Sequence, residues 1–116
     1  DMKPEMSAPQ VGKAVRTAMD EAYEFIVVNF ANGDMVGHTG NYEAAQKAVE
    51  AVDTELGKII EKAKEDGYAI VLTSDHGNCE EMCDLEGHAL TNHTVGEVWC
   101  FILADGIDEM KGSGGL

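Results

Sequence analysis

The sequence predicts an α/β fold in which a mainly parallel sheet carries helices on its faces. Three short apolar runs, at 25–30, 68–72 and 98–103, are rich in β-prone residues and typical of strands buried on both sides. A long stretch with helical spacing separates the first two runs, so strand, helix and strand form a βαβ unit. A chain of 116 residues is enough for one domain with one small core.

The first predicted helix begins near residue 7. Ser7 can act as its N-cap, Pro9 lies in its first turn, and Gln10 can complete a capping box. Helical spacing then places a series of apolar residues on one face: Val11, Ala14, Val15, Ala18 and Ala22. We therefore expect an amphipathic helix that leads into the first strand.

The second predicted helix is the clearest local pattern in the chain. Asn41 can cap its start, Glu43 and Lys47 form a favourable i,i+4 pair, and Gly67 can end it. Its apolar positions alternate between gaps of three and four: Tyr42, Ala45, Val49, Val52, Leu56, Ile59 and Ala63.

Residues that bind metals follow the first two predicted strands. Asp34 and His38 lie in a glycine-rich loop at 31–40, and Asp75 and His76 come directly after the second strand. Because the carboxyl ends of parallel strands meet at one edge of a sheet, we expect these four side chains to converge.

A further imidazole precedes the last apolar run, where His93 and His88 are rivals that residue type alone does not separate. With His93, the set has two carboxylates and three imidazoles but no thiolate, which suits Mn²⁺, Zn²⁺ or Mg²⁺. Five protein ligands exceed what one catalytic metal with an open position takes, so we expect two ions. A pair of ions that can clamp a phosphate points to phosphoryl chemistry.

Other polar residues near these segments have plainer interpretations. A hydroxyl at a buried strand end, such as Ser74, more often packs or hydrogen-bonds than acts as a nucleophile. Cys79 and Cys83 fit small hydrophobic residues better than ligands of a soft metal. Glu80 and Glu81 are expected on a solvated face or as hydrogen-bond partners of a ligand.

The charge of the chain limits its partners. With 22 acidic and 8 basic residues the net charge is −14, which excludes nucleic acid and anionic membrane surfaces and favours a cation. Arg16 is the only arginine, so an anionic substrate would need metal ions or basic groups from outside the chain. Three cysteines form no disulfide framework, and no secretion signal or membrane span is recognised, so we expect the cytoplasm.

Three segments resemble the C-terminal metal-binding motifs of the cofactor-independent (2,3-bisphosphoglycerate-independent) phosphoglycerate mutases. They are Asn-Phe-Ala-Asn-Gly-Asp-Met-Val-Gly-His-Thr-Gly at 29–40, Ser-Asp-His-Gly-Asn at 74–78 and Asn-His-Thr at 92–94. Lys-Pro-Glu-Met-Ser-Ala at 3–8 is similar to a segment before the same helix, so the match covers essentially the whole chain. The first motif is highly specific, whereas Asp-His-Gly-Asn also fits other members of the alkaline phosphatase superfamily, such as phosphopentomutase.

The resemblance implies an alkaline-phosphatase-like fold and a phosphoryl transfer between the 3- and 2-hydroxyls of glycerate through a phosphoserine, in glycolysis and gluconeogenesis. It implies that Asp34, His38 and His93 hold one divalent ion and that Asp75 and His76 hold part of a second. We expect Mn²⁺, with Mg²⁺, Co²⁺ and Zn²⁺ as alternatives. The expected substrate is phosphoglycerate, and the full-length enzyme is expected to be a monomer.

Several parts of the family pattern have no counterpart in this chain: the nucleophilic serine, a further metal-binding aspartate and the substrate-gripping arginines. Residues 95–100 also differ from the Asn-Pro-Val-Pro type common in the family, and 111–116 resemble the point before its last helix. We therefore interpret residues 1–116 as the C-terminal segment of a metal-binding phosphatase-type domain, truncated at both ends. Such a fragment should be inactive alone and able to self-associate through an uncovered sheet face.

Two alternatives remain open at this point. One is another binuclear phosphatase or phosphomutase of the same superfamily, and the other is a non-catalytic acidic domain that binds metal or a partner.

Overall fold

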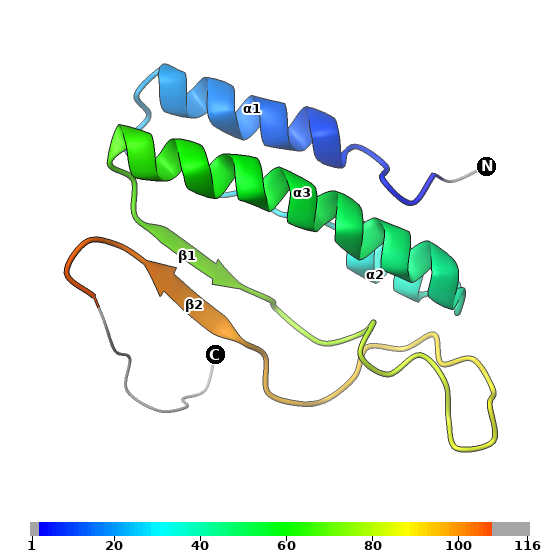
Figure 1. Ribbon diagram of the computed structural model, residues 1–116. Coiled ribbons are helices and arrows are strands. Elements are labelled where there is room, and N and C mark those ends of the chain that lie inside the picture. Colours follow the sequence, from blue (N-terminus) through cyan, green and yellow to red (C-terminus); the bar gives the residue numbers. More distant parts are fainter. Residues whose placement is uncertain (1–2, 108–116) are drawn as a thin grey trace.

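The computed structural model describes residues 3–107, so the glycine-rich end lies outside the described residues. Within this range the elements are α1 (Ala8–Asp20), α2 (Asn32–Gly37), α3 (Tyr42–Asp66), β1 (Ile70–Thr73) and β2 (Cys100–Leu103). Figure 1 shows α1 lying along α3, with the two strands on the other side of α3. The loops between the strands extend toward the end of α3 where α2 lies, and this end holds the candidate site.

The predicted boundaries of α3 are confirmed. The Asn41 side chain accepts a hydrogen bond from the Ala44 backbone N–H at 3.0 Å and caps the start of the helix. Gly67 ends it with a left-handed backbone (φ 80°), which favours glycine. Glu43 and Lys47 form the predicted ion pair at 3.2 Å.

The start of α1 follows the prediction only in part. Ser7 is the N-cap residue and a proline occupies the first turn, as expected. The Ser7 side chain makes no capping hydrogen bond, so the predicted capping box with Gln10 does not form.

Two clusters of buried apolar side chains hold the helices in place. In the first, α1 packs on α3 through Val15, Met19, Ile59 and Ala63. The second joins α2, α3 and the loop after β1 through Val36, Ala45, Ala48 and Met82. This second cluster fixes the loop after β1 against α2, which brings two of the predicted ligand segments together.

The strand arrangement differs from the prediction. β1 and β2 pair antiparallel, with Ile70 opposite Leu103 and Thr73 opposite Cys100. The predicted mainly parallel arrangement is therefore wrong for this pair. Apolar runs predict that strands exist, but the direction of pairing depends on the path of the chain between them, here residues 74–99.

Residues 25–30 are extended, as predicted, but pair with no strand within residues 3–107. Ile26 and Phe30 pack against the core between α1 and α3, whereas Phe25 is 85% exposed and Val27 is 79% exposed. The prediction that this run is buried on both faces is therefore wrong within the described residues, because only one of its sides has a neighbour.

Further large apolar side chains are exposed near β1 and β2: Val71, Trp99 and Phe101. The Trp99 and Phe101 rings stack on each other with centroids 6.2 Å apart. Among residues 3–107 no helix has the length and apolar character needed to cross a membrane.

Candidate metal centre

The segment predicted as a loop at 31–40 instead contains the short helix α2, which places two of the predicted ligands. Asp34 lies in the first turn of α2, and His38 follows its last residue. Because residues four apart in a helix share one side, the two side chains meet. His38 Nε2 lies 3.0 Å from Asp34 Oδ1.

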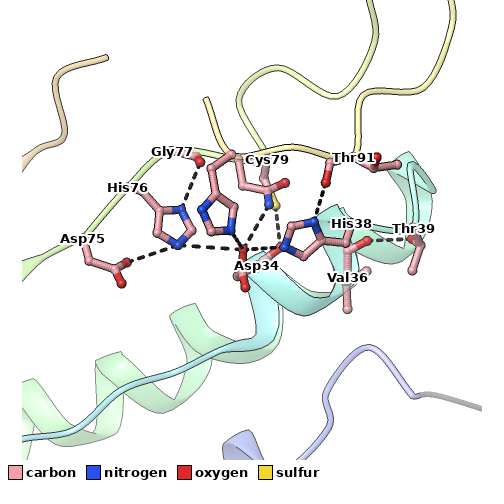
Figure 2. Close-up of polar contacts among 12 residues, drawn as sticks. Asp34, Val36, His38, Thr39, Asp75, His76, Gly77, Cys79 and Thr91 are labelled. Atoms are coloured by element: carbon pink, nitrogen blue, oxygen red, sulfur yellow. Dashed lines mark hydrogen bonds and ion pairs between the residues drawn. The ribbon is translucent and has the colours of Figure 1, made fainter. Parts of the chain in front are cut away.

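Two further imidazoles reach the same carboxylate oxygen from the loops between β1 and β2. His93 Nε2 lies 2.9 Å from Asp34 Oδ1, and His76 Nε2 lies 3.8 Å from it. The His76 and His93 rings stack, with centroids 3.6 Å apart and planes inclined by 12°. Figure 2 shows His38 and His76 directed toward Asp34 from different segments. The predicted convergence of these four side chains is confirmed.

Backbone carbonyls orient two of the imidazole rings. His38 Nδ1 lies 2.5 Å from the Thr91 carbonyl oxygen, and His76 Nδ1 lies 3.1 Å from that of Gly77 (Figure 2). Because a carbonyl only accepts hydrogen bonds, each Nδ1 carries the proton and each Nε2 keeps a free lone pair. The lone pairs of His38 and His76 therefore face Asp34, which is the arrangement a metal ligand needs.

The charge state of Asp34 depends on Asn78. Asn78 is buried, and its amide Nδ2 donates to Asp34 Oδ1 at 3.1 Å. Burial acts to raise the pKa of Asp34, but the Asn78 amide and the positive charge of the protonated imidazoles outweigh it, so the net shift is downward. Asp34 is therefore ionised at neutral pH.

Asp75 lies at the edge of the cluster. Its exposed carboxylate approaches His76 Nε2 at 3.7 Å, and no contact with Asp34, His38 or His93 is found in the described part of the chain. The structure thus brings together four of the five predicted ligands and leaves Asp75 beside the fourth.

The rivalry between His88 and His93 is resolved by position. His88 lies in an exposed loop, where its Nδ1 is 3.1 Å from Asp84 and 3.5 Å from Glu86. These three residues form a separate group of exposed donors, and His93 is the histidine that reaches Asp34.

Cys79 takes no part in this donor set. Its thiol donates to the Gly33 carbonyl at 3.0 Å, and its side chain packs against the second apolar cluster. Burial raises the pKa of Cys79, and the nearby Glu80 and Asp34 charges add to the effect, so the thiol stays protonated. This agrees with its interpretation as a small hydrophobic residue.

The donor atoms of Asp34, His38 and His93 lie within 4.8 Å of one another. Ligand atoms that share one ion at about 2.0–2.2 Å lie roughly 3–3.5 Å apart, so the Asp34 separations of 2.9 and 3.0 Å fit a common metal. One carboxylate with imidazoles and no thiolate suits a divalent ion of the Mn²⁺ or Zn²⁺ type.

Sequence reasoning missed the residues that support these donors. Asn78 ends the Ser-Asp-His-Gly-Asn motif, so its place beside two ligands was the available signal. Thr91 contributes a backbone carbonyl, for which side-chain identity carries no signal.

An α/β chain that gathers a carboxylate and three imidazoles at one point has the features of a metal-dependent enzyme. Residues 1–115 match the family described as "Metalloenzyme superfamily", and the chain belongs to that superfamily.

The chain is similar to proteins named 2,3-bisphosphoglycerate-independent phosphoglycerate mutase. It is 68% identical over 116 residues to the one from Wolinella succinogenes and 64% identical over 114 residues to the one from Sulfurimonas denitrificans. These matches cover 100% and 98% of this chain, which spans only 23% of each relative.

A solved structure shows the same likeness. A Leishmania mexicana phosphoglycerate mutase, crystallised at low cobalt concentration, matches with a TM-score of 0.82 and 35% identity. The match covers 91% of this chain and 22% of that one. The family resemblance inferred from the motifs is thereby confirmed, as is an alkaline-phosphatase-like fragment as its fold.

Proposed function

We propose that this chain supplies the metal-binding part of a 2,3-bisphosphoglycerate-independent phosphoglycerate mutase. The convergence of Asp34, His38, His76 and His93 on one point supports the proposal, in a chain 68% identical to a relative of that name. The reaction interconverts 3-phosphoglycerate and 2-phosphoglycerate through a phosphoserine, in glycolysis. The serine nucleophile is assigned to the rest of a longer, monomeric, cytoplasmic protein.

The ligand assignment follows the distances. Asp34, His38 and His93 would hold one divalent ion, and Asp75 with His76 would hold part of a second. We propose Mn²⁺ for both. The ions supply positive charge to the phosphoryl group during its transfer, which a chain of net charge −14 otherwise lacks. The chain itself contributes the ionised Asp34 carboxylate and imidazole nitrogens whose lone pairs face it.

Mutase activity is tested by a chimera. The matching segment of the Wolinella succinogenes relative is replaced by this chain, and conversion of 3-phosphoglycerate to 2-phosphoglycerate is measured with Mn²⁺ present. We expect activity in the chimera, and a loss with Asp34→Ala that exceeds the roughly 10–100-fold cost of removing an outer partner of a metal ligand. An inactive chimera that folds and binds Mn²⁺ would refute the mutase assignment, and release of free phosphate without isomer would indicate a phosphatase.

Metal binding is tested separately on the 116-residue chain. Free Mn²⁺ is followed by electron paramagnetic resonance during titration of the original chain and of the Asp34→Ala and His88→Ala variants. His88 is the matched control because it is an exposed histidine of the separate donor group. We expect Asp34→Ala to abolish tight binding and His88→Ala to leave it within about threefold. A loss under about tenfold for Asp34→Ala would argue against direct ligation.

A further inference from the structure

Two loops that carry candidate ligands are joined to each other. The Thr94 backbone N–H donates to the Gly77 carbonyl at 3.0 Å, and the two residues form an isolated antiparallel bridge. Residue 76 precedes one side of this bridge and residue 93 precedes the other, and their imidazole rings stack 3.6 Å apart. The spacing of the two rings therefore depends on how the two loops are held.

Both carboxylate oxygens of Glu80 are used at this bridge, one for each loop. Oε2 accepts a hydrogen bond from the Asn78 backbone N–H at 2.7 Å, and Oε1 accepts one from the Thr94 hydroxyl. Gly77 lies directly against this contact, since a Cβ there would overlap both the Glu80 carboxylate and the Thr94 hydroxyl. A carboxylate between two loops links them more strongly than a neutral acceptor, because its hydrogen bonds are charge-assisted.

The same contacts reach the third ligand segment through Asn78. Its backbone is held by Glu80, and its side chain, in a residue that is only 6% exposed, donates to Asp34. Glu80 therefore connects the loop with His76, the loop with His93 and the helix α2 with Asp34, although it touches none of these three side chains through a listed hydrogen bond of its own carboxylate in the described residues.

We propose that Glu80 is a positioning residue that sets the spacing of His76, His93 and Asp34 before any ion binds. This rests on the proposed function only for the consequence that metal affinity depends on Glu80. Ligands already held in place lose less conformational freedom on binding, which raises affinity. The adjacent Glu81 is exposed and provides a matched control of the same charge and residue type.

The first test uses the metal-free 116-residue chain. Stacked rings shift each other's proton resonances, so the His76 and His93 imidazole signals report the spacing directly in nuclear magnetic resonance spectra. We expect Glu80→Ala and Thr94→Val to lose this shift, and Thr94→Ser, which keeps the hydroxyl, and Glu81→Ala to retain it. Far-UV circular dichroism confirms that each variant remains folded. Should Glu80→Ala unfold, Glu80→Gln replaces it, because its single carbonyl oxygen cannot serve both donors.

The second test is the Mn²⁺ dissociation constant of the same variants. We expect Glu80→Ala and Thr94→Val to weaken binding about tenfold or more, with Thr94→Ser and Glu81→Ala within about threefold of the original chain. Unchanged imidazole shifts in a folded Glu80→Ala or Glu80→Gln chain would overturn the proposal, as would an equal effect from Glu81→Ala. If the original chain fails to bind Mn²⁺, the proposed function fails, while the metal-free spectra still decide the role of Glu80.

Discussion

A buried carboxylate between α1 and α3 gives a stability prediction that is independent of the metal centre. Glu55 is 3% exposed, and its two oxygens lie 3.2 Å from Arg16 Nη1 and 3.2 Å from Lys58 Nζ. A Cβ on Gly12 of α1 would overlap its carboxylate, so the two helices approach closely at this point. The change to be tested is Glu55→Gln, which keeps the shape of the side chain and removes its charge.

The expected cost follows from the two contacts. A hydrogen bond between charged groups contributes about 1.5–3 kcal/mol, and the low end applies to Arg16 because its side chain is partly exposed. Lys58 is more than half exposed and one turn away, so its pair contributes only about 0.2–0.5 kcal/mol. The sum is about 2 kcal/mol, which corresponds to a fall in Tm of about 8 °C for a domain of this size.

The pH dependence of this cost has a defined sign. Burial acts to raise the pKa of Glu55, but hydrogen bonds and charges from Lys58 and Arg16 outweigh it, so the folded pKa lies below its ordinary value of 4.5. The stabilisation is therefore complete above the unfolded pKa and is lost as the pH falls through the folded one. The difference in Tm between the original chain and Glu55→Gln should be constant from pH 7 to about 5 and close at lower pH.

The assay is thermal unfolding followed by far-UV circular dichroism at several pH values. Glu61→Gln is the control, since Glu61 is exposed on the same helix, and it should change stability by less than about 0.5 kcal/mol. A difference between the original chain and Glu55→Gln that persists unchanged to pH 3, or that is no larger than for Glu61→Gln at pH 7, would refute the reasoning.

Three further changes test individual contacts. Asn41→Ala removes the cap on the Ala44 N–H and should lower stability by about 1 kcal/mol in chemical denaturation, whereas Asn41→Ser should restore most of it. Tyr68→Phe removes the hydroxyl that donates to the Tyr23 carbonyl at 2.5 Å and should also cost about 1 kcal/mol. Gly77→Ala places a methyl group against the side chains that link the two ligand loops and should weaken Mn²⁺ binding about tenfold. An effect under a third of any stated value contradicts the corresponding contact.

The helices were predictable because their signals are local. Asn41 and Gly67 fix the ends of α3 through their own backbone and side-chain chemistry, and the structure places both as predicted. The direction of strand pairing is not local, because the same apolar run fits a parallel or an antiparallel neighbour. The run at 25–30 illustrates this limit, since its burial depends on which segments lie beside it.

The site was predictable from residue types that rarely occur together without a metal. Asp34, His38, His76 and His93 converge although the expected parallel sheet edge does not form from β1 and β2. The contribution of Asn78 was not foreseen, because an amide that orients a carboxylate follows no spacing rule and depends on the packing of the loop after β1.

Trp99 gives this chain a built-in optical reporter. It is the sole tryptophan, it is 80% exposed, and its ring stacks on Phe101 beside β2. Its fluorescence should therefore be red-shifted and readily quenched by iodide in the separate chain. Any protein surface that covers this region would shift the emission to shorter wavelength and shield the indole, so association could be followed without a label.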